Sequence, residues 1–564
     1  MFSKRDRPSR DGAPAGKRLR DGLCDLFASN VISGPRALEL LDDAQESGVR
    51  ECRGMASSSS ASTKHRHAAR DLRRRILKHS LWPSVYTAEV PTWDQKQDKL
   101  VATEMSFLLP HEVVHLMAAL GDIEELTQVS GLDRASLELY TKIQQEMQEP
   151  LVGIAVWGDG VPMNWDRSES LECVTWHLPG LSGHNKLMRF PFTALAHSQV
   201  ARNVTMDALL SIFVWSMKCL AEGRFPSRRH DGSAWTASDH RRALHGNHML
   251  KIKGVLLHVS GDWKFLKDVL RLPGWADSGG LCFRCRCTPE QLREVDMSAA
   301  WRSQPMTHWD LVQKLHLDGK LLSPLFAAPW FDAQTCIKLD WLHVADLGVT
   351  ADFLGSLFQL ALDKHFVAGR VQQRCSLLWK QVQDWYVEVK AGDRLTSLVT
   401  TMIKKRGSPY PKLRASGAQA RQLVPFGLKL ATTMDPADPE VQAATACASH
   451  LDACYQCLSL EGEGPAHLQE HSIRFASQWV ALERFFPERW HCKPKMHMFL
   501  ELCSQKIEPT KTWLYRDEDF GGSLAKFAKR SGGKLSAKTT SANLLHRYMM
   551  KQEPPRMLVT GCKK

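Results

Sequence analysis

The feature that most constrains the fold is an apolar run that ends on an acid. Residues 255–259 have the length and composition of a buried strand, and Ser260-Gly261-Asp262 follows directly. Residues 263–271 then have a helix-like pattern, which Pro273-Gly274 ends. An aspartate at the tip of a buried strand can face a ligand, or it can simply cap the next helix. Both interpretations of Asp262 stay open at this level.

A similar strand and acid come earlier in the chain. Residues 151–156 form an apolar run that leads into Gly158-Asp159-Gly160. Residues 172–178 and 188–195 predict two further strands, and residues 206–221 have the apolar spacing of a helix. Three strands, a helix and a fourth strand, with acids ending the first and fourth, is the order of a ribonuclease-H-like core. We therefore expect an α/β protein with a mixed sheet.

The rest of the chain suggests how this core is divided. Residues 70–75 and the Lys17-Arg18-Leu19-Arg20 stretch are basic and flank a serine run, whereas the chain after the core is helical in pattern without a convincing strand. The expected parts are a basic disordered arm (1–80), a helical lead-in (81–149), the first part of the core (150–287), an all-helical insertion (288–485), a segment that closes the core (486–535) and a C-terminal tail (536–564).

The net charge bears on the partner. A formal charge of +13 and a pI near 9.0 in a chain of 564 residues favour an anionic partner, most simply nucleic acid, although a protein can be basic without such a partner. The 15 cysteines and the charged first residues, without an apolar leader, indicate a reducing compartment. No apolar run approaches the length that spans a bilayer. We expect DNA as the partner, no contact with a membrane, and a nuclear location. A homodimer is possible, and the sequence leaves the oligomeric state open.

Three acids could form one catalytic site. Phosphodiester chemistry with two metal ions needs hard oxygen ligands from separate elements, which hold two Mg²⁺ or Mn²⁺ ions about 3.5–4 Å apart. Asp159 and Asp262 end neighbouring strands of the predicted core, and Glu518, from a late helix, is the chosen third ligand. The alternative for Glu518 is a solvated acid at a helix N-terminus. In the helical part, Asp340, His343 and Asp346 recur every third residue and could share a helix face.

A second group has the composition of a zinc site. Cys282-Phe-Arg-Cys285 has zinc-knuckle spacing, and it follows Asp262 at almost the same separation at which His497 precedes Glu518. One zinc ion bound by these residues would join the two ends of the helical insertion and fix the third acid against the strands. The other CxxC pair, Cys454 and Cys457, lies in a helical stretch and is interpreted as core packing.

These motifs, in this order, resemble the CACTA (En/Spm-like) family of DDE transposases, and their order is similar to that in the catalytic subunit of the antigen-receptor recombinase. The resemblance runs from about 150 to 535 as a set of short motifs. They are Gly158-Asp159-Gly160-Val161, Gly261-Asp262, Cys282-x-x-Cys285, Asp340-x-x-His343 with Leu347-Gly348, Lys493-Pro-Lys-Met-His497, and Trp513-x-Tyr-x-x-Glu518-x-Phe-x-Gly.

The resemblance implies a ribonuclease-H fold with an all-helical insertion, one structural Zn²⁺, and Mg²⁺-dependent DNA cleavage and strand transfer. Carried over by position, Asp159, Asp262 and Glu518 bind the catalytic metal ions. Cys282, Cys285 and His497 become zinc ligands.

The sequence departs from the family at two points. Where the family has a second histidine this chain has Glu501, so the fourth zinc ligand could be Glu501, His491 or Cys503, or the zinc site could be degraded. A recognisable N-terminal DNA-binding finger is missing. The expected function is a transposase-like DNA cleavage and strand-transfer enzyme. The alternatives are an inactive transposon-derived protein that binds DNA or a partner, and a helical interaction protein in which the acids are coincidental.

Overall fold

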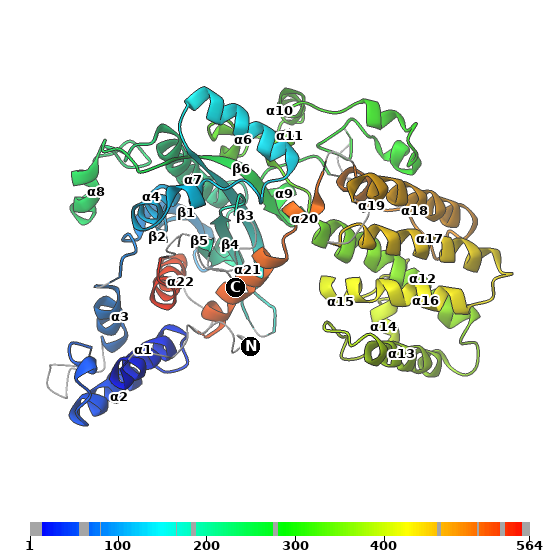
Figure 1. The fold of residues 1–564 in the computed structure, drawn as a ribbon, viewed down its shortest axis with the longest axis horizontal. Coiled ribbons are helices and arrows are strands. Elements are labelled where there is room, and N and C mark those ends of the chain that lie inside the picture. The colour runs from blue at the N-terminus through cyan, green and yellow to red at the C-terminus, as the bar shows by residue number, and fades with distance from the viewer. Residues whose placement is uncertain are drawn as a thin grey trace.

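The protein is a mixed α/β structure with one four-stranded and one two-stranded sheet (Figure 1). The computed structural model describes residues 14–55, 67–78, 80–164, 166–181, 188–274, 280–459, 464–504, 507–530 and 536–554. The serine run at 57–60 and the end of the chain from 555 onward lie outside the described residues.

The four predicted strands form the central sheet. They are β3 (Leu151–Pro162), β4 (Ser170–His177), β5 (Arg189–Ala196) and β6 (Lys253–Gly261), arranged in the order β5-β4-β3-β6. Strand β3 pairs with β6 in parallel, and the other two pairs are antiparallel. Nearly all of their residues are buried, because helices cover the sheet, and this is why the strands read as continuous apolar runs. The prediction of one mixed sheet from these segments is confirmed.

Helices and a hairpin surround this sheet. Helix α7 (Thr205–Glu222) packs on β6, and α4 (Pro110–Leu120) packs on α7. The hairpin of β1 (Tyr86–Asp94) and β2 (Lys99–Phe107) contacts α7 and β5. The expectation of a purely helical lead-in over 81–149 is therefore wrong. Strand β1 buries only alternate residues, and this weaker period-2 pattern was missed in the sequence. Helices α5 (Ile123–Leu126) and α6 (Arg134–Met147) complete this part.

The N-terminal residues also differ from the expectation. In place of a disordered arm, the described residues form α1 (Ala15–Ala28), α2 (Gly34–Glu46) and α3 (Ala68–Lys78). These helices bury a small apolar cluster of their own, which includes Phe27 and Leu41. Their many arginines and lysines lie mostly on the outer faces, so the low average hydrophobicity concealed three amphipathic helices.

The C-terminal residues are likewise part of the fold. Helix α22 (Ala537–Lys551), in the segment expected to be a tail, packs against β2 and β5. Its Tyr548 hydroxyl donates a hydrogen bond to the Arg189 carbonyl at 3.0 Å. In Figure 1 this helix (red) lies beside the sheet rather than away from it.

The described residues between 288 and 485 are helical, as predicted. No strand occurs among them, although Ile337 forms a single parallel bridge with Val259 of β6. Helices α12 to α18, together with α19 (Pro494–Leu502), lie in a group beside the sheet (Figure 1). The helices from 288 to 485 are α10 (His308–Leu317), α11 (Ala333–Cys336), the π-helical segment η9 (Leu342–Thr350), α12 (Ala351–Lys364), α13 (Val371–Glu388), α14 (Thr400–Ile403), α15 (Gly417–Gln422), α16 (Val424–Thr433), α17 (Pro439–Gln456) and α18 (Pro465–Phe485), besides short 3₁₀ turns.

One helical stretch qualifies by length and composition as a bilayer span. Residues Leu342–Lys364, which join η9 and α12, are long and apolar enough, contrary to the expectation that no segment would be. Most of that stretch is buried inside the protein, where it packs against α15, α16 and α19. Length and composition alone therefore do not distinguish it from a core helix.

Candidate functional site

The pairing of β3 with β6 brings the first two predicted acids to one edge of the sheet. Because the strands are parallel and Gly158 pairs with Gly261, the residues that follow, Asp159 and Asp262, come side by side. Asp262 follows the last residue of β6, but β3 continues past Asp159 to Pro162, so the prediction that Asp159 ends its strand is wrong. Both side chains are half-buried.

The glycines before these acids allow a close approach of α9 (Trp263–Asp268). A Cβ atom on Gly158 would lie 2.0 Å from the Phe265 ring, and one on Gly261 would lie 2.4 Å from the Gly158 carbonyl oxygen. Asp262 Oδ1 accepts a hydrogen bond from Phe265 N at 2.6 Å and so caps α9. Asp262 thus fulfils the helix-cap interpretation and also lies beside Asp159, so the two interpretations are compatible.

The third acid comes from α21 (Tyr515–Arg530), which lies against β3. Gly521 allows this contact, because a Cβ atom there would lie 2.7 Å from the Trp157 ring. One residue before Glu518, the fully buried Asp517 accepts two hydrogen bonds from Arg189 of β5, at 2.9 and 3.1 Å. Burial would raise the pKa of Asp517, but His177 and Arg189 hold it well below its usual value. This ion pair fixes α21 on the sheet, and sequence reasoning missed it.

The three predicted acids lie close enough to repel one another. Burial and then Asp262 raise the pKa of Asp159 to about 6. Burial and then Asp159 raise the pKa of Glu518 to about 8, with a smaller contribution from Asp262. Neighbouring carboxylates thus raise the pKa values of Asp159 and Glu518, which indicates excess negative charge that a cation would stabilise.

A histidine that faces Glu518 offsets part of this negative charge. His343 Nε2 lies 3.5 Å from Glu518 Oε1, and its Nδ1 lies 3.1 Å from Asp340 Oδ2. Burial would lower the pKa of His343, but Asp340, Glu518 and Asp159 together raise it to about 9. Asp340 therefore orients the ring and favours its protonated form near neutral pH.

The prediction that Asp340, His343 and Asp346 share one helix face is correct only in part. Asp340 and His343 are in contact, but Asp346 points to a different set of partners, since the segment winds as a π-helix. Asp346 is fully buried and accepts hydrogen bonds from Tyr455 at 2.6 Å and Tyr515 at 2.5 Å. Because Tyr515 begins α21, Asp346 helps to fix the helix that carries Glu518.

A further carboxylate, which the sequence did not single out, borders the same site. Glu172 of β4 lies opposite Gly160 and contributes to the raised pKa of Asp159. Its Oε1 is 2.7 Å from His197 Nδ1 and 3.8 Å from Lys264 Nζ. These partners counter the charge of Glu172 at the edge of the acid group.

The predicted cysteine and histidine ligands meet at a second site. Ligand atoms of Cys282, Cys285, His497 and Glu501 all lie within 4.8 Å of one another, and this group could bind a metal ion. His497 Nε2 is 3.3 Å from Cys285 Sγ and 3.7 Å from Glu501 Oε1. The Arg284 amide donates a hydrogen bond to Cys282 Sγ at 3.3 Å, which would stabilise a thiolate.

Of the three candidates for a fourth ligand, Glu501 joins this group. It follows His497 by one helical turn on α19, so both side chains project from one helix face. His491 lies elsewhere, 2.9 Å from Glu483 and stacked on Tyr410. Cys503 is not a member of the group and is buried among the helices.

Helix α19 links the two sites. Besides His497 and Glu501 it carries Lys495, whose Nζ donates a hydrogen bond to the His343 carbonyl oxygen at 2.7 Å. Gly348 leaves room for this contact, because a Cβ atom there would lie 2.7 Å from the Lys495 side chain. A metal ion bound by Cys282, Cys285, His497 and Glu501 would therefore also fix the segment that presents His343 to the acids.

Comparison with known proteins adds no identification. No family model matches the sequence, and no curated protein matches it. The functional interpretation therefore depends on the two sites themselves.

Proposed function

We propose that the protein is a DDE-type DNA transposase, or a domesticated relative of one, of the CACTA-like family. The observation that carries this proposal is that Asp159 of β3, Asp262 after β6 and Glu518 of α21 come together, so that neighbouring carboxylates raise the pKa values of Asp159 and Glu518. Such a group fits metal-dependent phosphodiester cleavage and strand transfer on DNA. The basic composition of the chain agrees with a DNA substrate and a nuclear location.

The fold supports the same proposal. The order β5-β4-β3-β6, with β3 and β6 parallel, agrees with a ribonuclease-H-like core. The Ile337 bridge continues the parallel pairing on the other side of β6. In this interpretation the helices between β6 and α21 are an insertion between the second and third acids of the site.

The donor set of the acid site fits Mg²⁺ or Mn²⁺. Its ligands are carboxylate oxygens, which these hard cations prefer, and Glu518 Oε1 is buried without a hydrogen-bond partner among the described residues. Two such ions would activate the attacking oxygen and stabilise the leaving oxygen of the phosphodiester. The chain's own residues fix the geometry: the cap of α9 restrains Asp262, and the Asp517–Arg189 pair holds the turn that carries Glu518.

The donor set of the second site fits Zn²⁺. Two thiols, an imidazole and one carboxylate suit a tetrahedral zinc site. Sulfur and nitrogen ligands are softer than the carboxylate oxygens that Mg²⁺ prefers, so this site does not suit Mg²⁺. All four ligands are protein side chains, as in structural sites. We assign this zinc a structural role: it would join the Cys282 loop to α19 and so keep Lys495 against the segment of His343.

The test is metal-dependent nicking of DNA by the purified full-length protein. Supercoiled DNA and duplexes with candidate transposon ends would be incubated with Mg²⁺ and with Mn²⁺. Nicking that the Asp159→Asn variant lacks would support the proposal. Binding to DNA without cutting, with either metal ion and on all substrates, would favour the alternative of an inactive transposon-derived DNA-binding protein.

A further inference from the structure

The segment between α7 and β6 projects from the protein as a well-ordered loop. Residues 224–249, which we call the 224–249 loop, contain the short helix α8 (His240–His245), and Figure 1 shows α8 at the left edge, away from the other helices. The loop closes on itself at its base: Phe225 N donates to the His248 carbonyl and Asn247 N donates to the Phe225 carbonyl, both at 2.9 Å.

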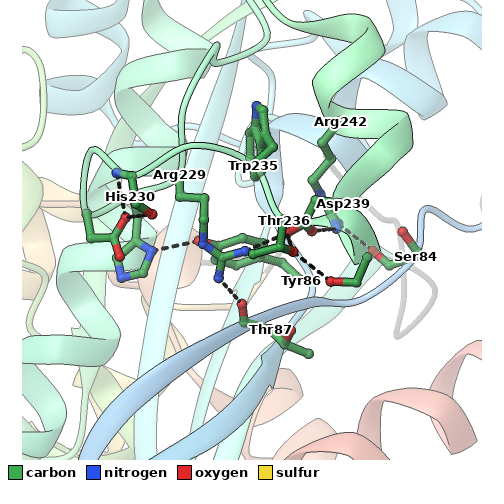
Figure 2. A network of polar contacts seen from close by, with 12 residues as sticks. Ser84, Tyr86, Thr87, Arg229, His230, Trp235, Thr236, Asp239 and Arg242 are labelled. Atoms are coloured by element: carbon green, nitrogen blue, oxygen red, sulfur yellow. Dashed lines mark hydrogen bonds and ion pairs between the residues drawn. The ribbon is translucent and has the colours of Figure 1, made fainter.

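A buried polar network ties this loop to β1 (Figure 2). Arg242 donates two hydrogen bonds to Glu112, at 2.6 and 2.8 Å, and one to Asp239 at 3.0 Å. Arg229 also pairs with Asp239 and donates to the Thr87 carbonyl at 2.6 Å. Two arginines thus meet two carboxylates, and the charges inside the network balance.

The Tyr86 side chain lies at the centre of this network. Its ring lies under both guanidinium groups, with the Arg229 and Arg242 carbons 4.9 and 5.4 Å from the ring centroid. Its hydroxyl oxygen is 2.7 Å from His230 Nδ1, and Trp235 packs against its ring edge-on. These contacts hold the base of the 224–249 loop in one conformation, so its outward side chains are pre-organised.

The remaining cations at the loop are exposed and have no carboxylate partners among the described residues. Four of them are exposed, and none forms an ion pair with a carboxylate of the described chain: Arg224, Arg228, Arg241 and Lys251. Three exposed histidines add to them: His240, His245 and His248. Among the described residues, the exposed acids Glu222 and Asp231 lie nearby, and Glu149, which pairs with Lys253, lines the same pocket as Lys251. The cations of the loop still outnumber the acids within it, so its outer surface has excess positive charge.

We infer that this outer surface of the 224–249 loop binds the phosphodiester backbone of duplex DNA. Exposed cations that no carboxylate pairs with, on a loop whose base is held in place, favour contacts with phosphates, since each contact releases bound counterions from the DNA. This inference rests on the proposed DNA substrate, but not on cleavage.

The phosphates bound here are not the scissile one. The loop enters the amino end of β6, whereas Asp262 follows its carboxyl end, and a strand of this length spans about 30 Å. The surface would therefore contact DNA roughly nine base pairs from the reacting bond if the duplex follows the strand. It is an anchoring surface, separate from the acid site.

The test compares two full-length triple variants with equal loss of charge. Arg228→Gln/Arg241→Gln/Lys251→Gln removes two loop cations and Lys251, which lies two residues after the loop, but leaves Arg229 and Arg242 in the network. Lys142→Gln/Lys380→Gln/Lys390→Gln removes exposed lysines from α6, from α13 and from the second position after α13. Binding to a generic duplex of about 30 base pairs would be measured at several salt concentrations without Mg²⁺ or Mn²⁺.

The loop variant should lose at least about tenfold in affinity, and the slope of log K against log salt should become shallower by about 0.9 for each phosphate contact removed. The control variant should stay within about twofold of wild type. Equal loss in both variants, no loss in the loop variant, or a loss seen only with RNA or with an acidic protein would overturn the inference. A wild-type protein that never nicks DNA, while the loop variant still loses DNA affinity, would refute the proposed catalysis and leave the inference standing.

Discussion

Arg189 and Asp517 form a two-point ion pair next to the third acid of the candidate site. The bonds, Nε to Oδ1 at 2.9 Å and Nη2 to Oδ2 at 3.1 Å, connect β5 with the first turn of α21. Asp517 is fully buried and Arg189 nearly so, and Glu518 is the next residue. The position of Glu518 relative to the strands therefore depends on a contact in which Glu518 takes no part.

Because of this ion pair, we expect that a substitution of Arg189, which is not one of the three candidate metal ligands, will strongly lower stability. Arg189→Gln would leave the Asp517 charge buried with His177 as its remaining ionic partner, and we expect the free energy of unfolding to fall by about 3 kcal/mol. Nicking should fall with it, because α21 loses its contact with β5. Chemical denaturation would measure the change. As a control, Lys538→Gln breaks the exposed pair with Glu104 and should change stability by less than about 1 kcal/mol.

Substitution of the acids should separate cleavage from DNA binding. We expect Asp159→Asn and Glu518→Gln to abolish nicking with Mg²⁺ and with Mn²⁺, because each removes a charged ligand from the proposed metal site. DNA affinity should be kept or rise slightly, since a negative charge that faces the DNA backbone is lost. The exposed Glu146→Gln serves as the control and should cut normally. Normal cutting by Asp159→Asn would show that the site is assigned wrongly.

Two other acids of the helical part, Glu483 and Asp346, would be unsuitable as controls. Glu483 accepts hydrogen bonds from Arg293 and Cys492, and Asp346 is fully buried between two tyrosines. Substituting either would damage packing, and a loss of activity there would say nothing about metal binding.

The second site predicts about one zinc per chain in the purified protein. Cys282→Ser/Cys285→Ser should lose it, because two of the four donors are removed. Glu501→Gln should bind zinc more weakly, since it replaces an anionic ligand, whereas His491→Asn should keep wild-type content. Elemental analysis after dialysis against a weak chelator would measure each. Zinc loss in His491→Asn with retention in Glu501→Gln would reverse the assignment of the fourth ligand.

A buried histidine on β6 predicts a pH dependence of stability. His258 Nε2 lies 3.0 Å from Asp133 Oδ2, and burial, together with the Lys338 charge, lowers the pKa of His258 to about 4. In the unfolded chain this pKa is about 6.5, so the unfolded state takes up the proton first as the pH falls. The contribution to stability is complete above about pH 6.5 and is lost progressively toward pH 4.

The His258→Gln variant measures this contribution. From pH 7 to pH 5 its free energy of unfolding should fall by about 2 kcal/mol less than that of wild type, because glutamine does not titrate. At pH 7 the variant should be about 1–2 kcal/mol less stable, since the hydrogen bond between His258 and Ser136 changes. Parallel curves for the two proteins between pH 7 and pH 5 would contradict the prediction.

The strands that could be predicted from the sequence are those in which nearly every residue is buried. Strands β3 to β6 are buried on both faces, so each is a continuous apolar run that can be recognised without its neighbours. Strand β1 buries alternate residues with Thr87, Glu89 and Pro91 between them, and this weaker signal was missed. Helices α1 to α3 were missed because their charged outer faces outweigh a narrow apolar stripe in the composition.

The candidate sites divide in the same way. Asp159 and Asp262 could be found because each follows an apolar run, and Cys282 and Cys285 because their spacing is typical of metal ligands. His497 could be found because its separation from Glu518 nearly matches that of Cys282 from Asp262. Nothing local marks Arg189 as the partner of Asp517, which lies 328 residues away. The choice of Glu501 over His491 as fourth ligand likewise depended on which side chain α19 directs toward the cysteines.

By itself the sequence determined the residue types and their order along the chain: two acids after buried strands, a CxxC motif, a late histidine and a late glutamate. The tertiary structure decided which of these residues meet. Their meeting depends on the parallel register of β3 and β6, on the ion pair by which Asp517 holds α21, and on the face of α19 that carries His497 and Glu501. Pairings across hundreds of residues depend on the geometry of packed elements, and that geometry leaves no periodic trace in the sequence around either partner.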